Sequence, residues 1–176
     1  MKVPFYILGL LMRHGPQHGY NIKQLVSDGI AAFAKIKLPT IYYHLEKLAE
    51  KGYVNSIVEK DGNRPEKIVY SITDSGVNYF NSLLNRILHE NYTVEFDFDG
   101  ALYFHSFTDK NTIINNLRKQ KEYIQNQLKE LIVHKENALN NLLPEYRIYC
   151  KSIFNHHIYH FETELKWIEE TIKELS

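Results

Sequence analysis

The segment from residue 38 to residue 54, LPTIYYHLEKLAEKGYV, carries the most constraining local pattern in the chain. Pro39 suits the first turn of a helix, where its missing N–H would have no partner. Gly52 is a common residue just after a helix end. The apolar residues that share one face, at positions i, i+4 and i+7, are Ile41, Leu45 and Leu48. The pattern predicts a short amphipathic helix that buries one face.

A second face of this helix carries polar, aromatic and basic side chains. Such groups reach phosphates and base edges in protein–DNA complexes. The candidate DNA contacts are Lys37, Thr40, Tyr42, Tyr43, His44 and Lys47. The pattern suits a recognition helix, and taken alone it suits an ordinary surface helix equally well.

Two further helices are expected before this segment. Residues 5–12, FYILGLLM, are nearly all apolar, as in the central helix of a small bundle. A second helix is expected from about His18 to Ser27, and residues 29–34 form the connection to the third. Three short helices joined by turns follow the helix-turn-helix plan.

A hairpin is expected directly after the third helix. Residues 53–59 and 67–72 are rich in β-branched and aromatic residues, and Asp61-Gly62 lies between them, which is a strong hairpin signal. The polar residues expected around its tip are Lys60, Asn63, Arg64 and Lys67, of which Asn63, Arg64 and Lys67 are further candidate DNA contacts. The hairpin could be a solvated turn, but its place after three helices favours the wing of a winged helix.

A fourth helix is expected to lead out of a first domain that spans residues 1–91. Thr73 is a suitable cap for it. The side chains expected on its buried side are Val77, Phe80, Leu84, Ile87 and Leu88.

The second half of the chain is expected to be helical. Residues 92–107 form an aromatic-rich connecting segment with an extended start and a short helix. Residues 108–176 form a coiled-coil-like domain of two long helices, capped by Thr108 or Asp109 and interrupted at Pro144. The apolar seam predicted to mediate dimerisation consists of Leu117, Ile124, Leu128, Leu131, Phe154, Ile158, Phe161, Leu165, Ile168 and Ile172. The two helices could also pair with each other, but each has apolar residues beyond one seam, which favours a dimer.

Composition is that of a soluble globular protein. The chain has 176 residues, of which 44% are hydrophobic and 24% charged. No apolar run approaches the roughly 20 residues that cross a bilayer, so no membrane partner is expected. A lone cysteine, Cys150, indicates a reducing, cytoplasmic location. Residues 1–75 hold 10 Lys and Arg against 7 Asp and Glu, and residues 76–176 hold 11 against 14, so only the first half is basic.

Catalytic and metal sites are not expected. The sequence has no Gly-rich phosphate loop, no nucleophile signature and no paired carboxylates in a recognisable setting, which argues against an enzyme and a cofactor. His156, His160 and Glu164 share a helix face and could present ligands to a metal, or they could form the solvated side of a coiled coil. Three ligands from one helix without a second cluster are weak evidence, so we predict no metal site.

Aromatic residues offer a candidate effector pocket. A planar apolar effector could bind at Phe96, Tyr103, Phe104, Phe107 and Trp167. The alternative is that these side chains form a core between domains. The alternative function is a helical adaptor module whose winged helix binds a protein partner, which would leave the basic hairpin unexplained.

Three segments together resemble the PadR-type transcriptional regulators, named for phenolic-acid decarboxylase repressors. ILGLLMRHGPQHGYNIKQL is similar to the family's first two helices, LPTIYYHLEKLAEKGYV to its third helix, and GNRPEKIVYSITDSG to its wing. The matching positions are Gly19, Tyr20, Thr40, Tyr42, Leu45, Leu48, Gly62, Arg64, Pro65, Lys67, Tyr70, Thr73 and Gly76. Tyr43 and His44 stand where the family varies, and Glu66 stands where a second basic residue is common. The long helical tail resembles the family's larger branch.

The resemblance implies a mainly α fold with a small β-hairpin. An N-terminal winged helix-turn-helix would precede a C-terminal long-helix dimerisation domain. It also implies a homodimeric repressor that binds a pseudo-palindromic operator in double-stranded DNA, with the third helix in the major groove. A small, aromatic effector would release it.

Overall fold

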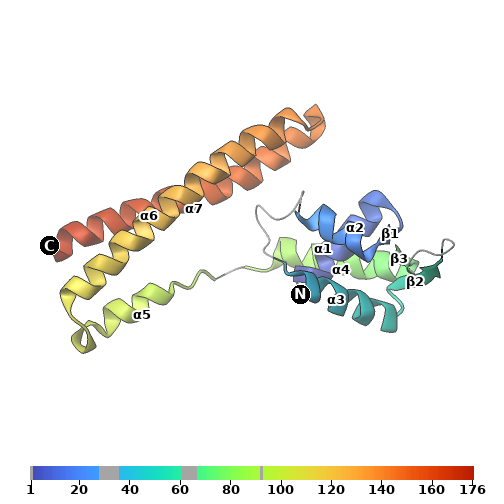
Figure 1. Ribbon diagram of the computed structural model, residues 1–176, viewed down its shortest axis with the longest axis horizontal. Helices are drawn as coiled ribbons and strands as arrows, with labels where there is room; N and C mark the ends of the chain where they lie inside the picture. The colour runs from blue at the N-terminus through green and yellow to red at the C-terminus, as the bar shows by residue number, and fades with distance from the viewer. Residues whose placement is uncertain (1, 28–35, 61–66, 92) are drawn as a thin grey trace. The chain divides into compact units, whose positions relative to one another are not determined.

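The computed structural model describes residues 2–27, 36–60, 67–91 and 93–176, and it contains two compact units, Met1–Tyr92 and Thr93–Ser176 (Figure 1). Both units are mainly helical, and the first also holds a small sheet. The predicted class, mainly α with a small β component, is confirmed. No helix in the described ranges is long and apolar enough to cross a membrane.

The first unit builds its core from three helices. Its elements are α1 (Lys2–His14), β1 (Gln17–His18), α2 (Gly19–Leu25), α3 (Leu38–Glu50), β2 (Val54–Glu59), β3 (Lys67–Ile72) and α4 (Asp74–His89). The side chains that are fully buried come from α1, α2 and α3, and they are Ile7, Leu8, Leu11, Ile22, Ile41 and Leu45. The order of elements is that of a helix-turn-helix followed by a wing.

α3 lies where the local pattern predicted it. Pro39 is in its first turn, and Gly52 follows its end with a φ of 70°, a value that favours glycine. The three apolar residues of its predicted core face, Ile41, Leu45 and Leu48, are all buried. This part of the prediction is confirmed.

The two predicted hairpin strands are present, but the sheet has a third strand. β2 and β3 pair antiparallel, from Val54 opposite Ile72 to Glu59 opposite Lys67. The short strand β1 pairs with the other edge of β3, so the sheet order is β1-β3-β2. A strand of two residues is too short to show a period of two, which is why the sequence did not predict it.

Two predicted segments lie outside the described residues. One is the hairpin tip at 61–66, which contains Asn63 and Arg64. The other is the connection at 28–35.

α4 is capped as predicted, but its buried face is shorter than expected. The side chains of Tyr79 and Phe80 pack against the core, and Leu83 is buried. Ile87 is 43% exposed and Leu88 is 71% exposed, so the prediction that both are buried is wrong for this unit. The reason is length: the last turns of α4 extend beyond the core that α1 supplies.

The second unit is a pair of long helices preceded by short ones. Its elements are α5 (Asp97–Tyr103), the 3-10 helix η2 (His105–Phe107), α6 (Lys110–Asn140) and α7 (Pro144–Leu175). Asp109 caps α6 by accepting a hydrogen bond of 2.8 Å from the Thr112 N–H. α6 and α7 lie side by side over most of their length (Figure 1).

The seam predicted to form the dimer lies between α6 and α7 of a single chain. Six of its ten residues are buried there, and the other four pack against the same clusters. The buried six are Leu117, Ile124, Leu131, Phe154, Ile158 and Ile168; the other four are Leu128, Phe161, Leu165 and Ile172. The buried part of this seam is therefore a contact within the chain, whereas Leu128, Phe161, Leu165 and Ile172 keep some exposed surface. The predicted role of the seam in dimerisation stays a prediction.

Two lysines cross this seam with polar contacts. Lys121 Nζ lies 2.8 Å from Glu169 Oε1, and Lys135 Nζ donates a hydrogen bond of 2.7 Å to Asn155 Oδ1. The stems of both lysines are half-buried, so the charged ends reach solvent along apolar surface.

The Thr73 hydroxyl, between β3 and α4, links the start of α4 to the turn after α3. Its removal tests this part of the fold. It accepts a hydrogen bond of 3.0 Å from the Gly76 N–H and donates one of 2.7 Å to the Gly52 carbonyl. We expect Thr73→Ala to lower the free energy of unfolding by about 1–2 kcal/mol, measured by urea denaturation. Ser82→Ala is the matched control, because the exposed Ser82 hydroxyl bonds only within its own helix. Equal losses in both variants would contradict this role of Thr73.

Candidate nucleic-acid interface

α3 presents its predicted DNA contacts on the surface of the first unit. Tyr43 is 56% exposed and Tyr42 is 38% exposed. Lys37 and Lys47 are exposed, whereas Thr40 and His44 are half-buried. Because the opposite face of α3 is buried in the core, these side chains occupy the remaining sides of the helix.

His44 is suited to contact a base as a neutral group. Its ring packs edge-on against Tyr43, with ring centroids 5.1 Å apart. Burial lowers the pKa of His44 below its ordinary value, so the imidazole is neutral at neutral pH. A neutral imidazole donates one hydrogen bond and accepts another, which matches the mixed donors and acceptors of base edges in the major groove.

Lys47 is paired with a carboxylate on its own helix. Its Nζ donates a hydrogen bond of 2.7 Å to Glu50 Oε2, and this bond raises the pKa of Lys47. The ammonium is exposed and fully charged, but Glu50 offsets its charge. Sequence reasoning missed Glu50, although the spacing of three residues on a helix was a usable signal.

Three DNA contacts are predicted for the wing, and one of them, Lys67, lies in the part of the hairpin that the structure describes. Lys67 is exposed at the start of β3, opposite Glu59. His18 Nε2 of β1 lies 4.0 Å from Glu59 Oε2. Asn63 and Arg64 belong to the hairpin tip outside the described residues.

The five predicted effector contacts do not form one cluster. Trp167 packs edge-on against Phe98, with ring centroids 6.0 Å apart, inside the second unit. Tyr103, Phe104 and Phe107 form a separate aromatic row, and each is more than half exposed. Phe96 is 54% exposed.

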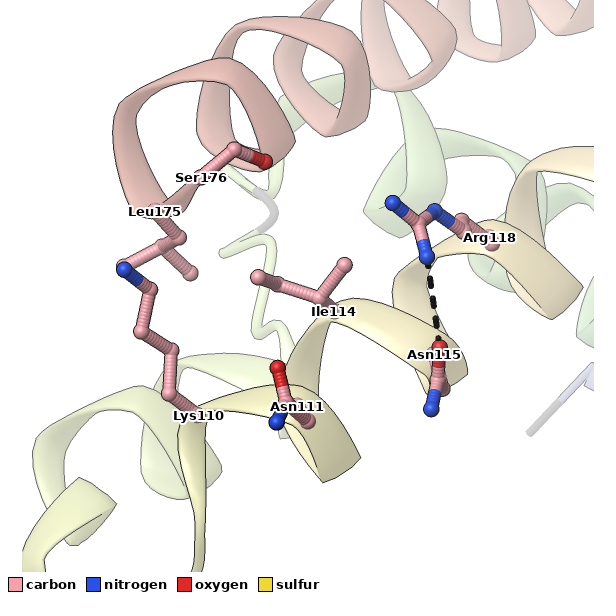
Figure 2. Close-up of a pocket in the computed structure, with 7 residues that line it drawn as sticks. All are labelled: Lys110, Asn111, Ile114, Asn115, Arg118, Leu175 and Ser176. Atoms are coloured by element: carbon pink, nitrogen blue, oxygen red, sulfur yellow. Dashed lines mark hydrogen bonds between the residues drawn. The ribbon is translucent and has the colours of Figure 1, made fainter.

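The second unit has an open cleft between the start of α6 and the end of α7, with a volume of about 530 Å³ (Figure 2). It is lined by Lys110, Asn111, Ile114, Asn115, Arg118, Leu175 and Ser176. Arg118 Nη1 donates a hydrogen bond of 3.3 Å to Asn115 Oδ1 across one helical turn. No predicted effector contact lines this cleft.

The histidines of α7 are close together. The rings of His156 and His160 have centroids 4.8 Å apart, and burial raises the pKa of Glu164. Among the residues that the structure describes, no three His, Cys, Asp or Glu side chains are grouped so that they could hold a metal ion.

Two protein families match the chain. The Transcriptional regulator PadR-like family matches residues 7–82, and the Virulence activator alpha C-term family matches residues 101–176. The negative transcriptional regulator PadR of Bacillus subtilis (strain 168) is 30% identical over 131 residues, which are 74% of this chain and 72% of that protein. The chain belongs to the PadR-like family of transcriptional regulators. The resemblance predicted from the sequence is confirmed.

Solved structures of PadR-like regulators share the fold of the whole chain. Bacillus subtilis PadR in complex with operator DNA has a TM-score of 0.79 at 24% identity and covers 100% of both chains. The same regulator in complex with p-coumaric acid has a TM-score of 0.76 at 24% identity and covers 98% of both. The Vibrio cholerae virulence activator AphA has a TM-score of 0.82 at 21% identity and covers 99% of this chain and 98% of its own.

Removal of the Glu50 charge tests whether Lys47 contacts phosphate. We expect Glu50→Gln to raise the affinity for DNA a few-fold, on specific and random sequences alike, because Lys47 is then free to neutralise a phosphate. The measurement is a fluorescence anisotropy titration at two salt concentrations. Glu90→Gln is the matched control, since it removes the same charge and an ion pair with Arg86 on α4. An equal rise in both variants would show that only net charge changed.

Proposed function

We propose that this PadR-like regulator is a homodimeric repressor that binds a pseudo-palindromic operator through α3 and the wing. The observation that carries the proposal is the division of α3 into a buried face and a polar, aromatic and basic face. One relative supports it twice: Bacillus subtilis PadR is a negative transcriptional regulator, and it has been solved in complex with operator DNA. The proposed activity is binding without catalysis. Its place is the cytoplasm, because the similar regulators are bacterial and operator DNA lies there.

The proposed contacts divide into two groups. Thr40, Tyr43 and His44 on α3 contact base edges in the major groove. The residues proposed to contact the phosphate backbone are Lys37, Lys47, Asn63, Arg64 and Lys67. Lysine and arginine at phosphates add affinity without sequence preference, so selectivity rests on the first group.

The proposed dimer surface lies outside the buried part of the α6–α7 seam, because those side chains are already covered within the chain. We place the surface on the outer side of α7, where Ile148 is 67% exposed, Tyr149 71% and Tyr159 60%. Ile148 and Tyr159 are about three turns apart and share one face of α7, while Tyr149 is turned by roughly 100° from Ile148. None of the three packs in the clusters between α6 and α7. A two-fold dimer presents two copies of α3 to half-sites about one turn of DNA apart, or a multiple of it.

A small aromatic effector is the proposed releasing signal. The Bacillus subtilis PadR solved with p-coumaric acid supports this chemical class. The proposed effector contacts are the exposed rings of Phe96, Tyr103, Phe104 and Phe107. Trp167 is the fifth proposed contact, and its ring packs edge-on against Phe98. Such an effector acts only if it binds better to a dimer geometry that does not fit the operator.

Substitutions on α3 and on the wing separate base contacts from phosphate contacts. We expect Tyr43→Ala and His44→Ala to weaken operator binding by about 1–3 kcal/mol while binding to random DNA is retained. Arg64→Ala should weaken both kinds of binding equally and reduce the salt dependence. Competition titrations on operator and scrambled duplexes measure the difference. If the α3 variants lost equal affinity on both duplexes, the proposed base contacts would be wrong.

A charge on the outer face of α7 tests the dimer surface. We expect Ile148→Glu to raise the dimer dissociation constant more than about tenfold, because the new carboxylate would be buried without a partner. Sedimentation equilibrium measures the constant. Gln125→Glu, which adds the same charge to the exposed side of α6, should leave it unchanged. An unaffected dimer in Ile148→Glu would exclude this face.

A further inference from the structure

Gly19 of α2 and Tyr42 of α3 make a very close contact. Gly19 is the first residue of α2 and is buried. A Cβ atom built on Gly19 would lie 2.6 Å from Cε1 of Tyr42, 3.3 Å from Cζ and 3.4 Å from Cδ1. Carbon atoms at 2.6 Å overlap strongly. The edge of the Tyr42 ring therefore lies directly on the backbone of α2, in space that only a glycine leaves open.

Tyr42 is near enough to the sheet to influence Tyr70. Tyr70 of β3 is 4% exposed, and its pKa is raised by burial and further by the charges of Glu46 and Tyr42. Glu46 lies one turn after Tyr42 on α3, so both side chains are near the Tyr70 phenol. One edge of the Tyr42 ring thus lies against α2, while 38% of the residue stays exposed.

We propose that the Gly19–Tyr42 contact sets the spacing of α2 and α3, and that Tyr42 positions the recognition helix instead of contacting a base. The inference rests on the proposed function, because it concerns how α3 is presented to DNA. Tyr43 and His44 follow Tyr42 directly in the chain. A displaced Tyr42 ring would therefore change the direction in which both neighbours project, without a change in their chemistry.

The proposal distinguishes the ring of Tyr42 from its hydroxyl. Tyr42→Phe keeps the ring on Gly19, so operator selectivity should be unchanged. Gly19→Ala forces the ring away from α2 and should lower the ratio of operator to scrambled-DNA affinity by about tenfold. The domain should still fold in this variant, because the buried core face of α3, formed by Ile41, Leu45 and Leu48, is unchanged.

A double-mutant cycle on the full-length chain tests the contact. Selectivity is measured for Gly19→Ala, Tyr42→Ala, Tyr42→Phe and the double variant Gly19→Ala/Tyr42→Ala. Without the ring, an alanine at position 19 meets no obstacle, so the double variant should be no worse than Tyr42→Ala alone. Gly9→Ala is the control at another close helix contact, since its Cβ would lie 3.0 Å from Phe80 Cε2, between α1 and α4. It should lower the melting temperature and keep selectivity.

The outcomes separate this inference from the proposed function. A parent chain without preference for operator DNA would overturn the proposed function. A selective parent whose Gly19→Ala variant is equally selective would overturn the positioning role, as would a Tyr42→Phe variant as defective as Tyr42→Ala. Thermal unfolding without DNA tests the contact separately: Gly19→Ala should lower the melting temperature of the parent but not of Tyr42→Ala. Additive shifts would show that the two residues do not act on each other.

Discussion

The burial of one face of α3 is the interaction on which the DNA-binding unit depends. Ile41, Leu45 and Leu48 are almost completely removed from solvent. Burial of a side chain of this size contributes about 1.5–3 kcal/mol each, so any rotation of α3 about its axis would be strongly opposed. The face that carries Tyr43, His44 and Lys47 is therefore directed outwards by the core. The polar front of α3 is a consequence of packing on its other side.

Burial of apolar side chains also organises the second unit, because surface that is covered within the chain is not available to a second chain. α6 and α7 enclose each other's seams, and Lys121 and Lys135 reach polar partners across the interface. An assembly of two chains must therefore use side chains that remain at least partly exposed, and the proposed surface on α7 is made of such side chains. Charged and amide contacts within the seam favour one alignment of the two helices, because a shift of one turn would leave the lysines without partners.

Local signals in the sequence predicted most of the elements. Pro39 and Gly52 mark the ends of α3, Thr73 and Asp109 cap the helices that follow them, and Pro144 begins α7. Each of these signals acts within a few residues, so periodicity and capping chemistry are sufficient to recognise them.

Contacts between distant segments account for what the sequence did not predict. β1 exists because β3 offers it a free edge, and Ile87 and Leu88 are exposed because the core ends before α4 does. The heptad pattern of α7 indicates that a partner helix is needed but not which chain supplies it. Likewise, nothing near Gly19 in the sequence shows that a tyrosine from α3 occupies the space above it.

The most direct test of the central claim is a binding titration of the intact protein on DNA that flanks its own gene, with scrambled DNA as competitor, at two salt concentrations. The account predicts selective binding by a dimer, with an affinity that falls as salt rises. If neither this DNA nor any sequence selected from a random library were preferred over scrambled DNA at low salt, the claim that α3 reads an operator would be contradicted.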